Sequence, residues 1–419
     1  MIKIKTLAKL DAAVHIPGSK SLTQRAMVIA ALAEGESLLR NVLVSEDTLA
    51  LADALRSFNA EITQDGTNMV IRGVGGAVSG TSEPIYLANN GTALRLLTGV
   101  ASLGRGPFTL TGDRRLCERP LKPLLDALGE LGVMCDTEEN RGYPPVTIRG
   151  GRLHGGSIVL RDIPSSQFVS SLLIAAPYAS GDIEIVLEGN IPSLPYIALT
   201  VETMQAFDVS VDQKGRSYYI RCKQTYRGRE YRIEGDASSA SYFFLAAALT
   251  GGRVRVKNIP RKTRQGDIGF LSILGNLSCE ICREDHFAEV RGGELPDGDM
   301  TFDLGEMPDI VPTLAVLCAM RPGRSAIRNI ANLRLKESDR IAALAAELRK
   351  TGISVDELPD SLIINGGNPH GARIKTYNDH RIAMSFAIMG LCVPGIEIEN
   401  EACIGKSFPG FLETMEKLY

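Results

Sequence analysis

The sequence predicts an α/β fold of two domains, each built from three repeated βαβαββ-like units in which buried parallel helices are walled by sheets. Three observations predict it: a period in the sequence, the composition of the helices in each period, and the place of the first strand. With 419 residues, the chain is too long for one ordinary domain and long enough for two.

A unit consisting of a polar start, an apolar helix, a glycine turn and a short strand recurs six times. The helix starts are spaced by 71, 74, 71, 73 and 71 residues, and the closing glycines by 71, 75, 71, 71 and 72 residues. Two independent landmarks with one period indicate a repeat architecture. The starts lie near Lys20, Gly91, Ser165, Asp236, Asp309 and His380. The glycines are Gly35, Gly106, Gly181, Gly252, Gly323 and Gly395.

The first helix of each unit is apolar almost all round, as in AMVIAALA, YFFLAAAL and IVPTLAVLCA. Such a helix is buried on every side. A second helix in each unit, as in DTLALADALRSFNAEI and SDRIAALAAELRKTGISV, repeats its apolar residues every three or four positions, which is typical of a half-buried helix. A strand follows it in five units, and the sixth such helix ends the chain. We therefore expect central helices inside sheets and amphipathic helices nearer solvent.

Six units divide into two domains of three. Because residues 1–17 form a strand segment before the first helix, they can complete the last domain. We predict one domain of residues 1–18 and 235–419, closed by both chain ends, and an inserted domain of residues 19–234. The two crossings, near Gly18 and residues 232–235, are expected to form a hinge, and the active site is expected in the cleft between the domains.

The charge balance and the apolar stretches restrict the partners. Lys and Arg number 46 against 49 Asp and Glu, a net charge of −3, which removes bulk attraction to nucleic acid. The longest apolar stretches are shorter than the roughly 20 residues of a membrane span. The first residues, MIKIKTLAKL, lack the apolar core of a signal peptide. We expect a cytoplasmic protein without nucleic-acid or membrane partners.

The eight cysteines are too sparse for a disulfide scaffold. Cys279 and Cys282 form a C-x-x-C pair, but in the strand predicted there they face opposite sides and do not converge on a metal. The cysteines are therefore predicted to be packing thiols in a reducing compartment, with no metal site.

Basic residues gather where the buried helices begin. A helix N-terminus attracts phosphate or carboxylate through its free N–H groups and its dipole. Ser and Asp at these starts are ordinary caps, but cations there oppose the dipole and predict an anionic ligand. Those cations are Lys20, Arg25, Arg95, His380 and Arg381, and further basic residues in loops or helix starts are Arg119, Lys336, Arg340 and Lys406. Each alone could be a surface charge, but together they predict two clusters that hold a small polyanion with phosphate and carboxylate groups.

Three candidate proton-transfer groups stand among these cations: Asp309, Glu337 and His380. Each has a structural alternative, namely a helix cap, a helix ion pair and a buried structural histidine. A carboxylate held ionised among cations can act as a general base, and a lysine such as Lys20 can donate a proton when neighbouring cations lower its pKa. The pattern predicts acid–base chemistry on an anionic substrate. No covalent nucleophile, dinucleotide fingerprint or GxxxxGK[ST] loop is found.

Eight motifs in order resemble the 5-enolpyruvylshikimate-3-phosphate (EPSP) synthases of the enolpyruvyl transferase family. They are PGSKSLTQRA, NNGTALR, GDRRLCERPL, SSQFVSSLL, EGDASSASYF, LKESDR, YNDHRIAM and GKSFPGF. The resemblance covers nearly the whole chain, and its fold is the two-domain, six-unit arrangement that the period predicts. Asn90 departs from the pattern, since the family often has Ala there.

The resemblance implies transfer of the enolpyruvyl group of phosphoenolpyruvate to the 5-hydroxyl of shikimate-3-phosphate. Phosphate is released through a tetrahedral intermediate, in the shikimate pathway of aromatic amino acid biosynthesis. It implies no metal, no organic cofactor and a monomer. Asp309 would be the base for the attacking hydroxyl, and Glu337 with Lys20 would manage the proton at the methylene carbon.

The resemblance also assigns substrate contacts by motif. The residues implied for shikimate-3-phosphate are Lys20, Ser21, Arg25, Ser165, Ser166, Gln167, Ser193, Tyr196, Asp309, Asn332 and Lys336. The residues implied for phosphoenolpyruvate are Lys20, Gly91, Arg119, Gln167, Arg340, His380, Arg381 and Lys406.

Two alternatives remain at this stage. The sister enzyme, UDP-N-acetylglucosamine enolpyruvyl transferase, usually has a reactive Cys five residues before the Arg-Pro of the second unit, where this chain has Arg114. A non-catalytic repeat protein that binds anions would lack acid–base residues, whereas Asp309, Glu337 and Lys20 are present.

Overall fold

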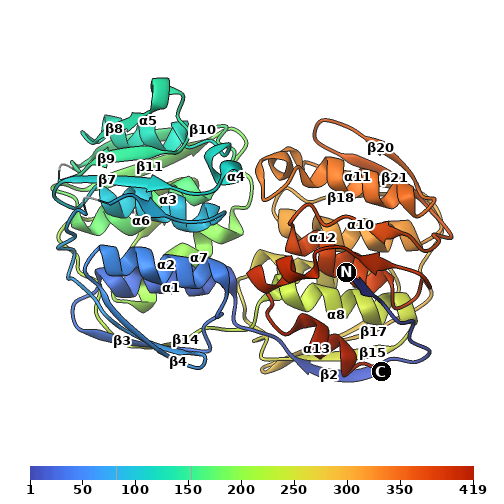
Figure 1. Ribbon diagram of the computed structural model, residues 1–419. Helices are drawn as coiled ribbons and strands as arrows, with labels where there is room; N and C mark the ends of the chain where they lie inside the picture. The colour runs from blue at the N-terminus through green and yellow to red at the C-terminus, as the bar shows by residue number, and fades with distance from the viewer. Residues whose placement is uncertain (82, 152) are drawn as a thin grey trace. The chain divides into compact units, whose positions relative to one another are not determined.

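The computed structural model describes residues 1–81, 83–151 and 153–419. The chain divides into two compact units. Unit 1 consists of Met1–Pro17 and Glu234–Tyr419, and unit 2 of Gly18–Ile233. Figure 1 colours the chain by residue number, so that unit 2 runs from blue to green and most of unit 1 from yellow to red.

Six buried helices, one in each sequence repeat, form the interior of the two units (Figure 1). In α8 every residue from Ala237 to Ala248 is buried, which confirms the prediction made from its all-round apolar composition. The starts also lie at or within two residues of the predicted ones. These helices are α1 (Lys20–Leu32), α3 (Gly91–Ala101), α6 (Gln167–Ala175), α8 (Ala237–Thr250), α10 (Val311–Met320) and α12 (His380–Met389).

The second helix of each repeat is amphipathic. In α11, Leu344 and Leu348 are buried while Lys350 is exposed. These helices are α2 (Glu46–Ser57), α5 (Lys122–Glu130), α7 (Pro195–Ala206), α9 (Phe270–Asn276), α11 (Arg340–Lys350) and α13 (Phe411–Glu416). The remaining helical segments are α4 (Arg114–Cys117), η1 (Glu138–Asn140), η2 (Ala176–Tyr178), η3 (Gly266–Gly269), η4 (Pro308–Ile310), η5 (Ala331–Leu335) and η6 (Glu401–Lys406).

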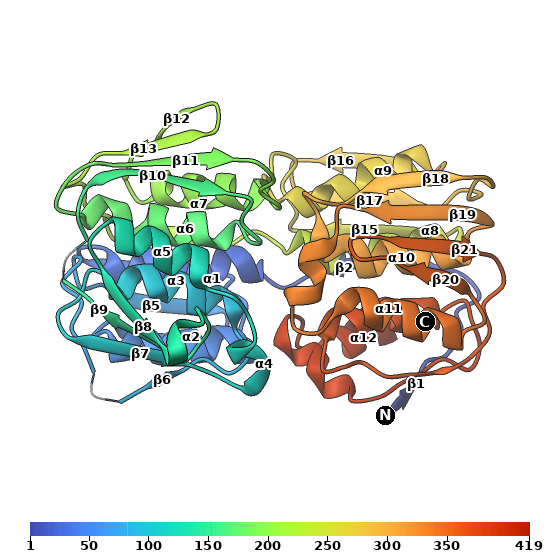
Figure 2. The same cartoon turned by 90° about the horizontal axis from the view of Figure 1, so that it is seen from above.

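The described residues of unit 2 form three four-stranded sheets, in the orders β14-β3-β5-β4, β6-β7-β9-β8 and β10-β11-β13-β12. The first pair of each is parallel and the other two pairs are antiparallel. Figure 2 shows the third of these sheets lying along α6 and α7. The strands are β3 (Glu36–Arg40), β4 (Glu61–Asp65), β5 (Asn68–Arg72), β6 (Ile85–Tyr86), β7 (Pro107–Thr111), β8 (Met134–Thr137), β9 (Val146–Arg149), β10 (Gly156–Arg161), β11 (Ile183–Glu188), β12 (Asp212–Lys214), β13 (Ser217–Ile220) and β14 (Glu230–Arg232).

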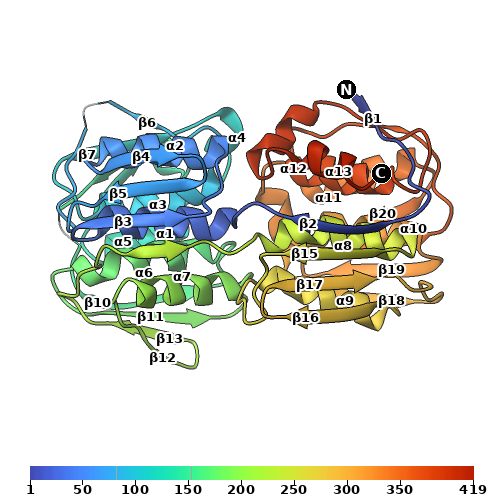
Figure 3. The same ribbon diagram turned by 90° about the horizontal axis from the view of Figure 1, so that it is seen from below.

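Unit 1 has the sheets β16-β17-β15-β2, β18-β19-β21-β20 and β1-β23-β22. Its two N-terminal strands pair with later parts of the chain. β2 lies parallel to β15 (Figure 3), with Val14 opposite Val256, and β1 lies antiparallel to β23. The strands are β1 (Ile2–Lys3), β2 (Asp11–His15), β15 (Arg253–Lys257), β16 (Glu280–Glu284), β17 (Phe287–Arg291), β18 (Met300–Asp303), β19 (Gly323–Arg328), β20 (Ser354–Glu357), β21 (Leu362–Gly366), β22 (Arg373–Ile374) and β23 (Glu397–Ile398).

Short polar side chains cap α1, α3, α8 and α12, as their types predict, whereas no side chain of the described residues caps α6 or α10, so Asp309 does not cap α10. Ser19 accepts the Leu22 N–H before α1, Asn90 the Ala93 N–H before α3, and Asp236 the Ser239 N–H before α8. Among the closing glycines, Gly35, Gly106, Gly323 and Gly395 have φ between +86° and +99°, a conformation that glycine adopts without strain. Within the described ranges, no helix is long and apolar enough to cross a bilayer.

The two C-x-x-C cysteines point to different sides. Cys279 is buried and Cys282, in β16, is exposed. Cys279 precedes β16 rather than lying in it, and the two thiols differ in burial as the prediction of opposite faces requires.

Close packing of α3 against α6 requires glycine at position 99, so Gly99→Ala should destabilise the protein. A Cβ at Gly99 would lie 2.6 Å from the backbone oxygen of Ser171. Although Ala favours a helix by up to about 1 kcal/mol, overpacking of roughly 1–3 kcal/mol should exceed that gain. The matched control is Gly129→Ala in α5, where a Cβ meets nothing within 4 Å. Denaturant unfolding should show a loss for the first variant and a small gain for the second; equal effects would contradict the packing argument.

Candidate functional site

The guanidinium of Arg340 organises a cluster of charges in unit 1. Arg340 is 0% exposed. Its Nε donates to Asp379 Oδ2 at 2.8 Å, its Nη1 to Asp309 Oδ1 at 2.9 Å and its Nη2 to Glu337 Oε2 at 2.8 Å. Although burial opposes its charge, Asp379, Glu337 and Asp309 raise the pKa of Arg340 above its ordinary value. Arg340 thus holds both predicted carboxylates, Asp309 and Glu337, in one place.

Asp309 is shared by three cations. Beside its bond from Arg340, its Oδ2 accepts Arg381 Nη2 at 2.9 Å, and Lys336 Nζ lies 3.8 Å from its Oδ1. Burial alone would raise the pKa of Asp309, but the positive charges of Arg381, Lys336 and Arg340 outweigh it and hold the pKa well below its usual range. Asp309, Lys336, Glu337, Arg340 and Arg381 are called the unit 1 cluster below.

The start of α12 is built around Asp379. This residue is 0% exposed, accepts the Arg381 N–H at 3.0 Å and a bond from Ser338 Oγ at 3.0 Å. It therefore caps the helix that carries Arg381 and binds Arg340 at the same time. His380 between them is also 0% exposed, with Nδ1 3.9 Å from Asp379 Oδ1, a separation too long for a hydrogen bond. His380 is thus buried to the same degree as Arg340.

A further carboxyl group, Asp267 of η3, interacts electrostatically with Asp309 and Arg381 of the cluster. It is 2% exposed and accepts a hydrogen bond from Ser238 Oγ at the start of α8. Burial and the nearby charge of Asp309 raise its pKa to about 7, and Arg381 opposes them. Near neutral pH this group is therefore divided between its protonated and ionised forms.

In unit 2, the predicted cations of α1 are fixed by buried polar side chains. Lys20 Nζ donates to Asp47 Oδ2 at 3.2 Å, and Asn90 Nδ2 donates to the backbone oxygen of Asp47 at 2.8 Å. Arg25 is 1% exposed; its Nε donates to Thr200 Oγ1 at 2.8 Å, and its guanidinium carbon lies 5.7 Å from the Tyr196 ring centroid. Burial lowers the pKa of Arg25 to about 10, so it remains charged at neutral pH.

The start of α3 brings four other predicted residues together. A Cβ at Gly91 would lie 2.4 Å from the guanidinium carbon of Arg119, so a side chain at this position would displace the Arg119 guanidinium. Arg95 Nη1 donates to the Gly91 oxygen at 3.1 Å and to Gln167 Oε1 at 3.0 Å, and Gln167 Nε2 donates to Thr92 Oγ1 at 2.9 Å. Gly91, Arg119 and Gln167, with Lys20 and Arg25, are called the unit 2 cluster below.

The other residues assigned by motif have simpler surroundings. Ser165 accepts the Gln167 N–H at 3.3 Å, and Ser166 precedes α6. Ser193 has φ +62°, and its backbone oxygen accepts the Tyr196 N–H. Ser21 accepts Arg25 Nη1 through its backbone oxygen, Asn332 lies in η5, and Lys406 ends η6 with 9% exposure.

Several residues of these networks were not predicted. They are Asp47, Asp267 and Asp379, together with Ser170 and Thr200, which contact Arg25. Asp379 stands next to His380 in the YNDHR motif, so its place at a helix start could have identified it as a cap. Asp47 and Asp267 lack such a signal, because only the fold brings them to Lys20 and Asp309.

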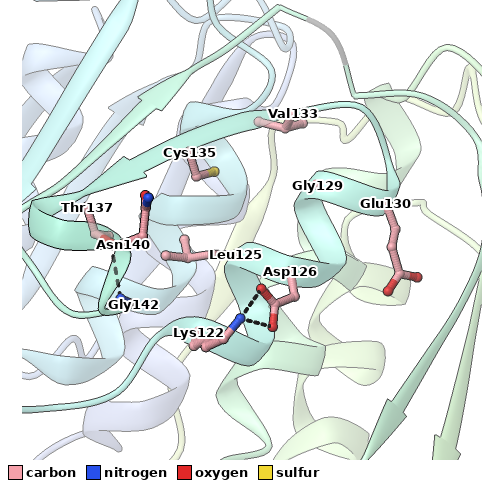
Figure 4. A pocket seen from close by; sticks show the side chains of 10 residues that line it. All are labelled: Lys122, Leu125, Asp126, Gly129, Glu130, Val133, Cys135, Thr137, Asn140 and Gly142. Carbon is pink, nitrogen blue, oxygen red and sulfur yellow. Dashed lines mark hydrogen bonds and ion pairs between the residues drawn. The ribbon is translucent and has the colours of Figure 1, made fainter.

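A groove of about 500 Å³ lies elsewhere on unit 2, along α5 and β8, and none of the predicted site residues line it. Figure 4 shows Lys122 and Asp126 on its wall pointing toward each other, with Lys122 Nζ 2.7 Å and 2.9 Å from the two carboxylate oxygens. Of the three charged side chains that line this groove, Lys122 and Asp126 thus bind each other, and Glu130 is the third.

The raised pKa of Asp267 predicts a pH-dependent stability that Asp267→Asn should remove. The carboxyl titrates near 3.9 in an unfolded chain and at about 7 in the folded protein. As the pH rises between these values the unfolded state loses its proton first, so wild-type stability falls and stays lower above pH 7. The melting temperature of Asp267→Asn, measured relative to that of wild type, should therefore rise between pH 5 and pH 8. Each kcal/mol of difference in the free energy of unfolding corresponds to about 2–4 °C. The exposed Asp285→Asn serves as the control, and a difference independent of pH would contradict the assignment.

Comparison with known proteins gives one consistent family. The family model of EPSP synthase (3-phosphoshikimate 1-carboxyvinyltransferase) matches residues 4–415. A 3-phosphoshikimate 1-carboxyvinyltransferase from Methanothermobacter thermautotrophicus is 43% identical over 418 residues, covering 100% of this chain and 98% of the relative. One from Syntrophobacter fumaroxidans is 43% identical over 420 residues, covering 99% of each chain. The solved structure of EPSP synthase from Acinetobacter baumannii has a TM-score of 0.82 at 28% identity, covering 99% of this chain and 97% of that one.

These matches confirm the resemblance drawn from the eight motifs and favour the shikimate enzyme over its sister enolpyruvyl transferase. The family's reaction belongs to the shikimate pathway of aromatic amino acid biosynthesis. The chain belongs to the EPSP synthase family and is an enolpyruvyl transferase, which transfers the enolpyruvyl group of phosphoenolpyruvate to the 5-hydroxyl of shikimate-3-phosphate and releases phosphate.

Proposed function

We propose that the unit 1 and unit 2 clusters act together on the two substrates, in a cleft that forms between residues 1–18 with 235–419 and residues 19–234. The proposal rests on the surroundings of Asp309, an ionised carboxylate. It accepts hydrogen bonds from Arg340 and Arg381, and Arg340 also donates to Glu337. Such a group can accept a proton where anionic substrates are bound.

The substrate contacts are those that the family motifs assign, and the cations of the two clusters support the assignment. Shikimate-3-phosphate is held by Ser21, Arg25, Ser165, Ser166, Gln167, Ser193 and Tyr196 of unit 2, with Lys20, Asp309, Asn332 and Lys336. Phosphoenolpyruvate is held by Lys20, Gly91, Arg119, Gln167, Arg340, His380, Arg381 and Lys406. Arginine suits phosphate and carboxylate because its planar fork donates two parallel hydrogen bonds.

In the addition step, the 5-hydroxyl oxygen forms a bond to C2 of phosphoenolpyruvate while its proton passes to Asp309. The methylene carbon C3 gains a proton from the pair Glu337 and Lys20 and becomes a methyl group. In the elimination step the bond from C2 to the phosphate oxygen breaks, phosphate leaves, and the methyl group returns a proton as the double bond forms again. Fixed cations stabilise an intermediate that still carries both phosphate groups.

Substrate binding also explains how Asp309 becomes basic. In the free protein its pKa is held well below the usual range by Arg381, Lys336 and Arg340, so it is a weak base. The phosphate and carboxylate groups of the substrates compete for these cations. When one of these cations binds a substrate anion instead, it stabilises the ionised form of Asp309 less. The pKa of Asp309 then rises toward that of an effective base.

The protein is proposed to work as a cytoplasmic monomer. In support, one chain supplies residues for both substrates, and the chain crosses between the units only at residues 17–18 and 233–234. These two crossings would form the hinge of a closure that excludes water from the intermediate. Small-angle scattering with both substrates should then give a smaller radius of gyration than without them, at a mass of one chain.

A phosphate-release assay tests the substrate pair. Phosphoenolpyruvate with shikimate-3-phosphate should release phosphate, whereas phosphoenolpyruvate with UDP-N-acetylglucosamine should not. Release only with the nucleotide sugar would favour the sister reaction, and release with neither would favour binding without catalysis.

Asp309→Asn tests the proposed base. The amide keeps the size of the side chain but cannot take the hydroxyl proton, so kcat should fall by roughly 10²–10⁴-fold, as for a lost acid or base, with smaller changes in KM. The control is Asp299→Asn, whose side chain is 77% exposed beside Arg324, and it should retain kcat. Normal turnover in Asp309→Asn would eliminate the role.

A further inference from the structure

α11 carries a second buried charged residue beyond Arg340. Glu347 is 0% exposed and follows Arg340 by seven residues, or two helical turns, so the two side chains leave the same face of the helix. Both hold the segment that leads into α12. Arg340 binds Asp379 at the end of this segment, whereas Glu347 binds its beginning.

Both carboxylate oxygens of Glu347 accept hydrogen bonds, two of them from this segment and one from Lys350. Its Oε2 accepts the Lys375 backbone N–H at 3.0 Å and Lys350 Nζ at 2.7 Å, and its Oε1 accepts the Tyr377 hydroxyl at 2.8 Å. Burial and the bond to Glu347 raise the pKa of Tyr377 to about 12, so the hydroxyl keeps its proton and donates it. The phenol is thereby tied to α11.

The segment between the two attachments has an uncommon backbone. Tyr377 and Asn378 are consecutive left-handed residues, with φ of +54° and +55°. Asn tolerates this region, but a bulky residue such as Tyr rarely adopts it and requires support from its surroundings. The turn closes with the Asp379 N–H donating to the Thr376 oxygen at 2.9 Å. It delivers Asp379 to Arg340 and to the N–H of Arg381, whose side chain then reaches Asp309.

We propose that Glu347 and Tyr377 are positioning residues for the unit 1 cluster: their hydrogen bond holds residues 376–379 in the left-handed turn and so sets where Asp379 and Arg381 stand. Neither residue needs to touch a substrate. The expected effect on turnover rests on the proposed function, in which Arg340 and Arg381 bind phosphoenolpyruvate.

The test compares Tyr377→Phe, Glu347→Gln and the double variant. Phe lacks the donor, and Gln has only one oxygen for donors that now use two. Each single variant should raise the KM for phosphoenolpyruvate about 5–20-fold while the KM for shikimate-3-phosphate, held mainly by unit 2, stays within about twofold. Because both changes break the same hydrogen bond between Tyr377 and Glu347, their effects on KM should not multiply. The double variant should resemble a single variant. Lys262→Gln, at an exposed lysine outside this segment, is the control and should stay near wild type.

Tyr377→Asn separates turn geometry from packing. Asn adopts the left-handed region readily, so this variant should recover part of the activity that Tyr377→Phe loses. A packing role for the ring predicts the reverse order, with Phe nearer wild type than Asn, and that order would overturn the proposal. Multiplicative losses in the double variant, or equal increases in both KM values, would also overturn it.

Hydrogen exchange gives a readout that does not depend on catalysis. Amides of a peptide spanning residues 375–382 should exchange faster in Tyr377→Phe and Glu347→Gln than in wild type, and unchanged exchange would show that the bond does not hold the turn. A wild-type chain without turnover would contradict the proposed function and, with it, the expected KM effects. The exchange result would still decide whether Glu347 and Tyr377 fix this segment.

Discussion

The structure of the unit 1 cluster depends on one buried guanidinium. Arg340 is 0% exposed and donates to three carboxylates from three parts of unit 1. Removing one member of a buried ion pair is strongly destabilising, by roughly 3–5 kcal/mol, because an uncompensated charge remains. The buried charge of Arg340 is therefore stabilised by Asp309, Glu337 and Asp379, and it stabilises their charges in return. This mutual dependence places two predicted acid–base groups side by side before any substrate is bound.

Charge balance explains the different behaviour of neighbouring carboxyl groups. The cations Lys336, Arg340 and Arg381 are matched by the anions Asp309, Glu337 and Asp379. Asp267 would be a fourth negative charge in a buried place, and its pKa rises to about 7, whereas the directly bonded Asp309 stays ionised. Burial and direct partners, rather than residue type, decide which carboxyl group is charged.

The fold could be predicted because its signals are local. An all-apolar helix such as α8 shows its burial in its composition, and glycines such as Gly35 mark a turn that needs positive φ. Lys20 and Arg381 could be identified because cations at a helix start are unusual. The partners of these cations could not be identified in this way. Asp47 lies 27 residues from Lys20, a separation that the repeat does not specify. Asp309 lies 72 residues from Arg381, close to one repeat, but a repeat that aligns helix starts does not specify which side chains bond between them.

The difference between local and long-range signals also applies to Asp379, whose cap position is visible in the sequence while its bond to Arg340 is not. Asp379 looks like a helix cap in sequence, and it is one, since it accepts the Arg381 N–H. A cap has two carboxylate oxygens and also needs its own chain held in place. The second oxygen binds Arg340 at 2.8 Å, and the left-handed residues before it, Tyr377 and Asn378, fix the direction of approach. A residue that begins a helix can thus orient the cation beside it, because capping restrains the backbone and leaves hydrogen-bonding capacity for a second partner.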